Sequence, residues 1–180
     1  MLQKNQRKAL LLSSLGGMLE FYDFIIYALL ASYISKLFFP IQSVITSLLI
    51  AFSAYAVGYL ARPFGGIFGH FGDKYGRKKT FTISILIMAL STFLIGILPT
   101  YSSIGIMAPI LLVLCRIAQG ISVGGEIPGA ITYVGEAVPE KRGFMTAVIF
   151  GFLILGVAVG FIVESLLLEF FTSQSMLTYG

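Results

Sequence analysis

GHFGDKYGRKK, residues 69–79, is the stretch that decides how this chain folds. Gly72 and Gly76 allow a tight reversal of the backbone, and the last residues of the stretch are basic. Long apolar segments lie on both sides of it, and we expect them to form helices over residues 44–71 and 80–98. A basic reversal between two apolar helices of this length is typical of a loop that anchors a membrane protein at an anionic cytoplasmic surface.

The composition of the whole chain agrees with a membrane location. The 180 residues are 57% hydrophobic and only 11% charged, and the mean hydropathy is +0.95. Soluble domains carry roughly 25% charged residues, so a water-soluble enzyme is excluded. One crossing of the hydrocarbon layer takes about 20 residues. We therefore expect an all-α membrane protein with about five transmembrane helices, over residues 9–35, 44–71, 80–98, 104–137 and 144–167.

Basic residues are distributed unevenly over the expected loops. Nine of the twelve Lys and Arg residues lie at the N-terminus and in the second and fourth connections, against Lys36 alone on the other side. The positive-inside rule then predicts a cytoplasmic N-terminus. A cleaved signal peptide is the alternative for the first segment, but its apolar stretch continues past Glu20 and Asp23 without a clear cleavage site.

Several ionisable residues interrupt the expected helices. They are Glu20, Asp23, Arg62, Arg116 and Glu126. A charge at the bilayer centre costs ~2.5–3.5 kcal/mol even on a lenient scale, so such residues persist where they pair or face a wet cavity. Glu20 and Asp23 share a helix face with Gly16 and Tyr27, and Gln119 shares a face with Glu126. The first and fourth expected helices therefore each carry a polar stripe.

The charge count inside the membrane is unbalanced. Three carboxylates stand against two arginines, which leaves one carboxylate without a fixed counter-ion. Desolvation favours the neutral form of such a group, so it can take up a proton. Our hypothesis is that Glu20, Asp23 or Glu126 carries a coupling proton. The alternative is that all five groups form static ion pairs.

Small residues and prolines add information on packing. Gly-x-x-x-Gly spacings, which allow close helix approach in lipid, occur at residues 65/69, 120/124, 125/129 and 156/160. Pro63, Pro109 and Pro128 lie within expected spans, where a missing N–H kinks a helix. The only cysteine is Cys115, so neither an internal disulfide nor a cysteine metal cluster can form, and we expect no metal or other cofactor.

Two motifs together resemble the major facilitator superfamily. The loop fits the pattern G-x-x-x-D-[RK]-x-G-R-[RK]-[RK], and residues 116–124 fit R-x-x-Q-G-x-x-x-G. Further strings, at residues 20–24, 62–66, 98–109, 119–126 and 136–145, resemble the metabolite:proton symporter family. Within that family the likeness is strongest to the proline/betaine transporters, with dicarboxylate and other organic-acid symporters next.

The resemblance implies a function and assigns residues to it. It implies a multi-pass protein of the cell inner membrane that works by alternating access and carries a small carboxylate-bearing solute together with a proton. The solute would be proline, betaine or an organic acid such as 2-oxoglutarate. The protein would lie in the lipid bilayer and would not bind nucleic acid. The implied substrate-binding residues are Arg62, Arg116, Gln119 and Tyr27. The implied cytoplasmic gate consists of Gly69, Asp73, Lys74, Gly76, Arg77, Glu136 and Arg142.

The length of the chain limits this interpretation. Members of the family have twelve helices in two halves, so residues 1–180 are expected to be helices 1–5, with helix 6 and the second half missing. The alternative is a truncated membrane remnant that does not transport. A membrane enzyme or ATP-driven subunit is disfavoured, because no G-x-x-x-x-G-K-[ST] loop is present and His70 has no apparent nucleophile or metal partners.

Overall fold

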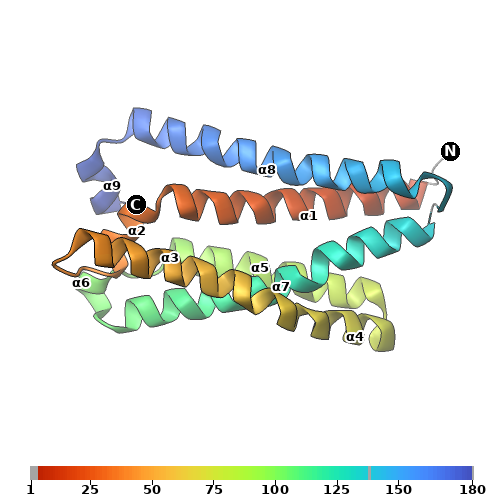
Figure 1. The fold of residues 1–180 in the computed structure, drawn as a ribbon, viewed down its shortest axis with the longest axis horizontal. Helices are drawn as coiled ribbons and strands as arrows, with labels where there is room; N and C mark the ends of the chain where they lie inside the picture. Colours follow the sequence, from red (N-terminus) through yellow and green to blue (C-terminus); the bar gives the residue numbers. More distant parts are fainter. Residues whose placement is uncertain (1–3, 138, 180) are drawn as a thin grey trace.

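The computed structural model describes residues 4–137 and 139–179, and long helices run side by side through it (Figure 1). Each long apolar stretch folds as a helix because the backbone must satisfy its own hydrogen bonds in lipid. The elements in chain order are α1 (Lys4–Leu29), α2 (Ala31–Phe38), α3 (Val44–Ala61), the 3₁₀ turn η1 (Arg62–Gly65), α4 (Gly66–Tyr75), α5 (Arg77–Gly96), α6 (Tyr101–Ile104), α7 (Met107–Ala137), the 3₁₀ turn η2 (Pro139–Lys141), α8 (Arg142–Phe170) and α9 (Ser173–Tyr179).

Membrane-crossing length is reached by most of the expected spans. Among the described residues, Val44–Gly72, Met107–Gly125 and Pro139–Phe170 are long and apolar enough to cross a bilayer. Ser14–Leu29 and Ala31–Phe38 together form a fourth candidate, bent by 68°. The apolar part of α5, Thr82–Gly96, is shorter than a full crossing. The expectation of an all-helical membrane protein is therefore confirmed, whereas the expectation of five full-length spans is met by three or four with one shorter helix.

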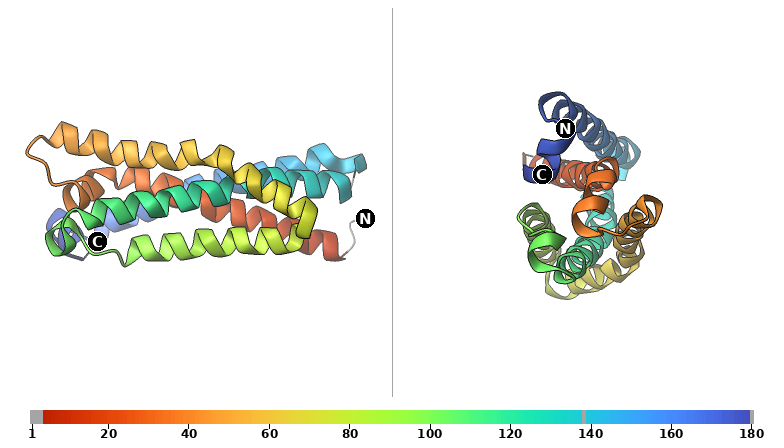
Figure 2. Two further views of the ribbon diagram at one scale, coloured as in Figure 1. Left: turned by 90° about the horizontal axis from the view of Figure 1, so that it is seen from below. Right: turned by 90° about the vertical axis from the view of Figure 1, so that its left-hand side faces the viewer.

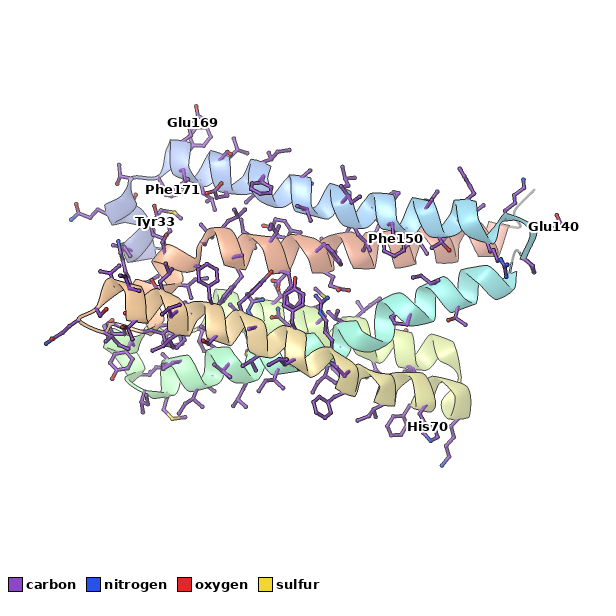
Figure 3. All side chains as sticks on the ribbon, in the orientation of Figure 1. Tyr33, His70, Glu140, Phe150, Glu169 and Phe171 are labelled. Atoms are coloured by element: carbon purple, nitrogen blue, oxygen red, sulfur yellow. The ribbon has the colours of Figure 1, made fainter. Side chains whose placement is uncertain are left out.

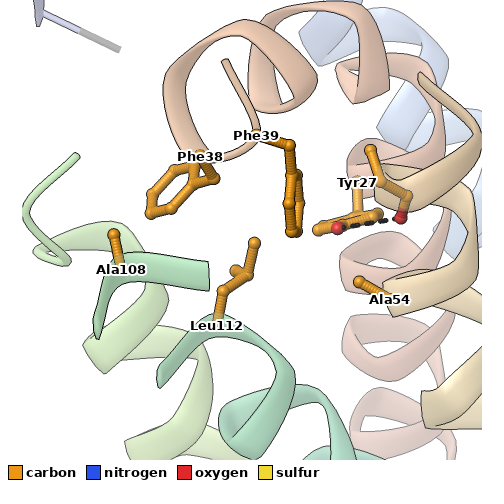
Figure 4. Close-up of a cluster of buried hydrophobic side chains, with 7 residues drawn as sticks. Tyr27, Phe38, Phe39, Ala54, Ala108 and Leu112 are labelled. Carbon is orange, nitrogen blue, oxygen red and sulfur yellow. Dashed lines mark hydrogen bonds between the residues drawn. The ribbon is translucent and has the colours of Figure 1, made fainter. Parts of the chain in front are cut away.

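The bend between α1 and α2 corrects the expected unbroken helix over residues 9–35. Leu30 separates the two helices, and α2 turns across the end of the bundle (Figure 1). Phe38 and Phe39 at its end are buried beside Tyr27 of α1 and Leu112 of α7 (Figure 4). The Tyr27 hydroxyl donates a 3.2 Å hydrogen bond to the carbonyl oxygen of Ala51 in α3. This apolar cluster closes the end of the bundle next to the residues described below.

The helix expected over residues 44–71 is interrupted at Arg62–Gly65. Pro63 removes a backbone donor there, and the chain passes through the 3₁₀ turn η1 before α4 continues to Tyr75. The expected kink at Pro63 is thus confirmed. Pro109 does not kink a span, because it lies in the first turn of α7, where its N–H would have no helical partner in any case.

Turn residues were only partly predicted. Gly76 has φ +99° and reverses the chain between α4 and α5, as expected. Gly72, by contrast, lies inside α4. The expected helix over 104–137 begins at Met107 instead, after the short α6 and a turn at Gly105 with φ +60°.

Glycines allow the helices to cross closely. A Cβ atom added to Gly120 would overlap the carbonyl oxygen of Gly58, and one added to Gly124 would overlap that of Arg62. On the other side of the bundle, α8 packs along α1, and a Cβ atom at Gly156 would overlap the backbone of Met18. The packing role expected for these glycines is confirmed for the 120/124 and 156/160 pairs and for Gly65. Gly69 and Gly129 lie outside the described part of the chain.

The basic segments gather at one end of the bundle. The start of α1, the α4–α5 reversal and η2 lie together there, and α2, α6 and α9 lie at the opposite end (Figures 1 and 2). His70 and Glu140 are at the basic end, and Glu169 is at the other (Figure 3). His70 is exposed and contacts the ring of Phe71.

Candidate functional site

A buried polar network joins α1 to α7. Nη1 of Arg116 lies 2.9 Å from Oδ2 of Asp23, and Nε2 of Gln119 donates a second hydrogen bond of 2.9 Å to the same oxygen. Arg116 is 2% exposed, Asp23 7% and Gln119 0%. The polar stripes expected on the first and fourth helices therefore face each other. The carboxylate of one helix and the donors of the other satisfy each other where no water is available.

Gln119 extends this network to a third helix. Its Nε2 also donates a 2.8 Å hydrogen bond to Oγ1 of Thr92 in α5. One turn beyond Gln119 on α7, Ser122 exchanges hydrogen bonds with Ser84 of α5 through both hydroxyl and carbonyl groups. Side-chain hydrogen bonds thus hold α5 against the face of α7 that carries the polar stripe.

A second ion pair lies next to the first. Nη2 of Arg62, in η1, is 3.8 Å from Oε1 of Glu20 in α1. Glu20 is fully buried, whereas the Arg62 side chain is 24% exposed. The interruption of the helix at Pro63 places Arg62 here, at the close crossing of η1 with α7. This pair is longer and more accessible than the Asp23–Arg116 pair.

Aromatic rings form a wall beside both guanidinium groups. Phe24, Tyr27, Tyr55 and Tyr59 contact one another with ring centroids 5.0–5.8 Å apart. The Arg62 guanidinium carbon lies 4.0 Å from the Tyr59 ring centroid and 4.6 Å from that of Phe24. The guanidinium carbon of Arg116 lies 3.9 Å from the Tyr27 ring centroid. Each arginine therefore has a carboxylate and an aromatic face as neighbours, a setting that stabilises a desolvated cation.

Some donors and acceptors on the arginines and the glutamine of the network have no hydrogen-bond partner within the described residues. They are Nε of Arg62, Nε of Arg116 and Oε1 of Gln119. A buried polar atom without a partner costs about 1–3 kcal/mol. The site therefore retains donor and acceptor capacity that a bound polar ligand or water would satisfy.

Most of the residues expected at the binding site come together. Glu20, Asp23, Arg62, Arg116, Gln119 and Tyr27 form one continuous group. The side chain of Glu126 lies outside the described part of the chain. The rings of Tyr55 and Tyr59 and the hydroxyl of Thr92 were not predicted. Tyr55 and Tyr59 are four apart on the helix that leads to Arg62, which was the available signal.

The expected gate residues are described less completely. Gly76 makes the reversal, Lys74 is exposed in the last turn of α4, and Arg142 is exposed at the start of α8. The side chains of Asp73, Arg77 and Glu136, and Gly69, lie outside the described part. The α4–α5 reversal and η2 are at the same end of the bundle, as a gate would require (Figure 1). Because the contacts between the gate side chains are not described, the gate stays a prediction.

Comparison with known proteins agrees with the resemblance in the sequence. The family model described as Major Facilitator Superfamily matches residues 10–178. A proline/betaine transporter of Salmonella typhimurium is 50% identical over 141 residues, and that of Escherichia coli K12 is 49% identical over 141 residues. A putative proline/betaine transporter of Staphylococcus aureus COL is 40% identical over 183 aligned residues, which include 98% of this chain.

The relatives are much longer than this chain. The alignment with the first two covers 77% of this chain but 28% of each relative, and that with the third covers 39% of the relative. No solved structure matches the chain.

Proposed function

The chain belongs to the major facilitator superfamily, and we propose that it supplies the N-terminal part, helices 1–5, of a proton-coupled symporter for a small carboxylate-bearing solute. Its relatives are named for proline and betaine, and both solutes carry a carboxylate. In the full transporter the charged group of α1, η1 and α7 would line the solute pathway. The family match also supports a transporter rather than an enzyme.

The observation that carries this proposal is the pairing of two arginines with two carboxylates among membrane-spanning helices. Guanidinium binds carboxylate in a planar, two-pronged geometry, so a solute carboxylate can take the place of a protein one. Alternating access requires contacts between helices that can be exchanged, and a 3.8 Å ion pair is easier to exchange than a hydrogen-bonded one. Arg62 is therefore the preferred contact for the solute carboxylate, with Arg116, Gln119 and Tyr27 behind it.

The proton carrier follows from the same charge count. Glu20 and Asp23 each lie beside one of the two intramembrane arginines. Glu126 is the surplus carboxylate in this count, seven residues from Gln119 on the same helix. We therefore favour Glu126 over Glu20 and Asp23 as the group that takes up the coupling proton. Glu164 is left out of this count because it lies on α8 and not on α1, η1 or α7, which carry the paired charges.

A chimera tests transport and substrate together. Residues 1–180 would replace the aligned N-terminal region of the Staphylococcus aureus relative, and vesicles containing the product would be given proline, betaine or 2-oxoglutarate. We expect uptake of at least one solute that an inward proton gradient accelerates. Glu126→Gln should keep exchange of solute across the membrane but lose the response to the gradient. If the unsubstituted chimera took up solute at the same rate with and without the proton gradient, proton coupling would be contradicted.

The chain by itself should not transport. Its relatives are more than twice as long, and a site that opens alternately to two sides needs a second set of helices to move against. Vesicles containing the 180-residue chain alone should therefore take up no solute beyond the passive rate. Measured gradient-driven uptake by the purified chain would overturn this expectation.

A further inference from the structure

The Phe24–Tyr59 pair of rings has the shape of a site for an organic cation. The two ring centroids are 5.0 Å apart, with planes inclined at 66°, and the Arg62 guanidinium lies against both faces. Tyr55 contacts both rings, and its hydroxyl lies 3.1 Å from that of Tyr59. Recognition of quaternary ammonium groups uses aromatic cages of this kind.

Charge completes the cage. The buried Glu20 lies next to the guanidinium that the rings hold, so a cation in this place faces a carboxylate as well as aromatic rings. Arg62 is held there loosely: its ion pair is 3.8 Å long, and its Nε has no hydrogen-bond partner among the described residues. Its contacts with the two rings and with Glu20 are ones that another cation in the same place can take over.

We propose that a zwitterion inserts into the Glu20–Arg62 pair, with its cationic group taking the place of the guanidinium against the rings of Phe24 and Tyr59 and its carboxylate binding the displaced Arg62. This inference rests on the proposed function and adds to it a cation subsite. Charge balance is unchanged by the exchange, because Glu20 gains the cation of the ligand and Arg62 gains its carboxylate. An anion without a cationic group would leave Glu20 without that compensation, at the cost of a buried charge.

The two arginines differ in a way that assigns this role to Arg62. Arg116 is 2% exposed and hydrogen-bonded to Asp23, whose oxygen Gln119 also binds. Tyr59 is 41% exposed and the Arg62 side chain 24% exposed, so the second pair can be reached from outside the described bundle. Arg116 therefore positions the helices, and Arg62 meets the ligand.

The depth of the site separates a free solute from a lipid headgroup. Within the candidate span Val44–Gly72, Arg62 lies about 27 Å of helix from one end and about 15 Å from the other. A headgroup at either surface would not reach the middle of the span. A choline headgroup shares the chemistry of the ligand, so the test is made in maltoside detergent and repeated with added phosphatidylcholine.

The experiment measures binding of betaine to the purified 180-residue chain by calorimetry. The chain contains no Trp, so tyrosine fluorescence gives a second readout close to the site. The comparison ligand is 3,3-dimethylbutanoate, which has the shape and carboxylate of betaine but carbon in place of the charged nitrogen. We expect betaine to bind at least tenfold more tightly. Equal binding of the two ligands, or no binding of betaine, would overturn the inference, as would competition by phosphatidylcholine equal to that by betaine.

Variants test the cage itself. Tyr59→Leu removes the ring and should weaken betaine binding about 5- to 30-fold, whereas Tyr59→Phe keeps the ring and should bind betaine as the unsubstituted chain does. Tyr101→Leu, at the far end of the bundle, is the matched control. Helical circular dichroism establishes that each variant is folded. Betaine binding that Tyr59→Leu leaves unchanged would refute the cage, while uptake by the chimera would still stand for the proposed function.

Discussion

Asp23 and Arg116 show how single residues stabilise this bundle. Both are buried, and their hydrogen bond spans 93 positions of the sequence between α1 and α7. A buried pair is a weak source of stability as a whole, because desolvation offsets the attraction. The loss of one partner is different, since it leaves a charge in a medium that cannot solvate it. Removing Asp23 alone should therefore destabilise the bundle by more than the intact pair stabilises it.

Neutralising one partner should accordingly cost more than neutralising both. We expect Asp23→Asn to lower the free energy of unfolding by about 3–5 kcal/mol, and the double variant Asp23→Asn with Arg116→Met to cost less than that. Unfolding in detergent mixtures, followed by circular dichroism, measures both. Glu140→Gln, at an exposed position, serves as the control with little change. Additive costs in the double variant would show that the two residues do not interact.

At the scale of elements, close helix crossings set the geometry of the site. Gly120 and Gly124 of α7 let the backbone of α3 and η1 approach, and this approach brings Arg62 to Glu20. In lipid there is no hydrophobic driving force for helices to associate. Close contacts between backbones therefore supply much of the van der Waals energy that holds them together. A side chain at Gly120 or Gly124 would push α7 away from α3 and η1, and it would also pull Arg62 away from Glu20.

Gly124→Ala tests this crossing. The new methyl group would overlap the Arg62 carbonyl, so we expect a loss of about 1–3 kcal/mol in the free energy of unfolding. Gly151→Ala is the matched control, because nothing lies within 4 Å of a Cβ atom there. The control should be neutral or slightly stabilising, since alanine favours helix. Equal effects at both positions would mean that the crossing does not depend on the missing side chain.

Helices were predicted well where the length of an apolar stretch determines their bounds. They were predicted less well where tertiary contacts determine where a helix bends or ends. The helices from residues 44 and 144 onward follow from hydropathy alone. The bend at Leu30 carries no Pro or Gly, and it depends on Phe38 and Phe39 finding a buried place against α3 and α7. The charged residues of the site could be predicted because charge is rare in lipid. Tyr55, Tyr59 and Thr92 resemble ordinary membrane residues until their neighbours are known.

The whole molecule has one basic end, and its orientation is a prediction that can be measured. We expect that end to face the cytoplasm, because translocation of Lys- and Arg-rich loops is disfavoured. In a Cys115→Ser background, Lys141→Cys should react with a membrane-impermeant maleimide only after the inner face is opened. Thr100→Cys, at the other end, should react in intact cells. The reverse pattern would place the basic end outside.

The central claim for the whole molecule is that the paired charges of α1, η1 and α7 bind the solute as part of a transporter. Gradient-driven uptake by the chimera, compared between the unsubstituted form, Arg62→Gln and the exposed control Lys141→Gln, tests it most directly. The account predicts uptake with the unsubstituted chimera and with Lys141→Gln, and at least a tenfold loss with Arg62→Gln. Full uptake with Arg62→Gln, by a chimera inserted in equal amount, would contradict it.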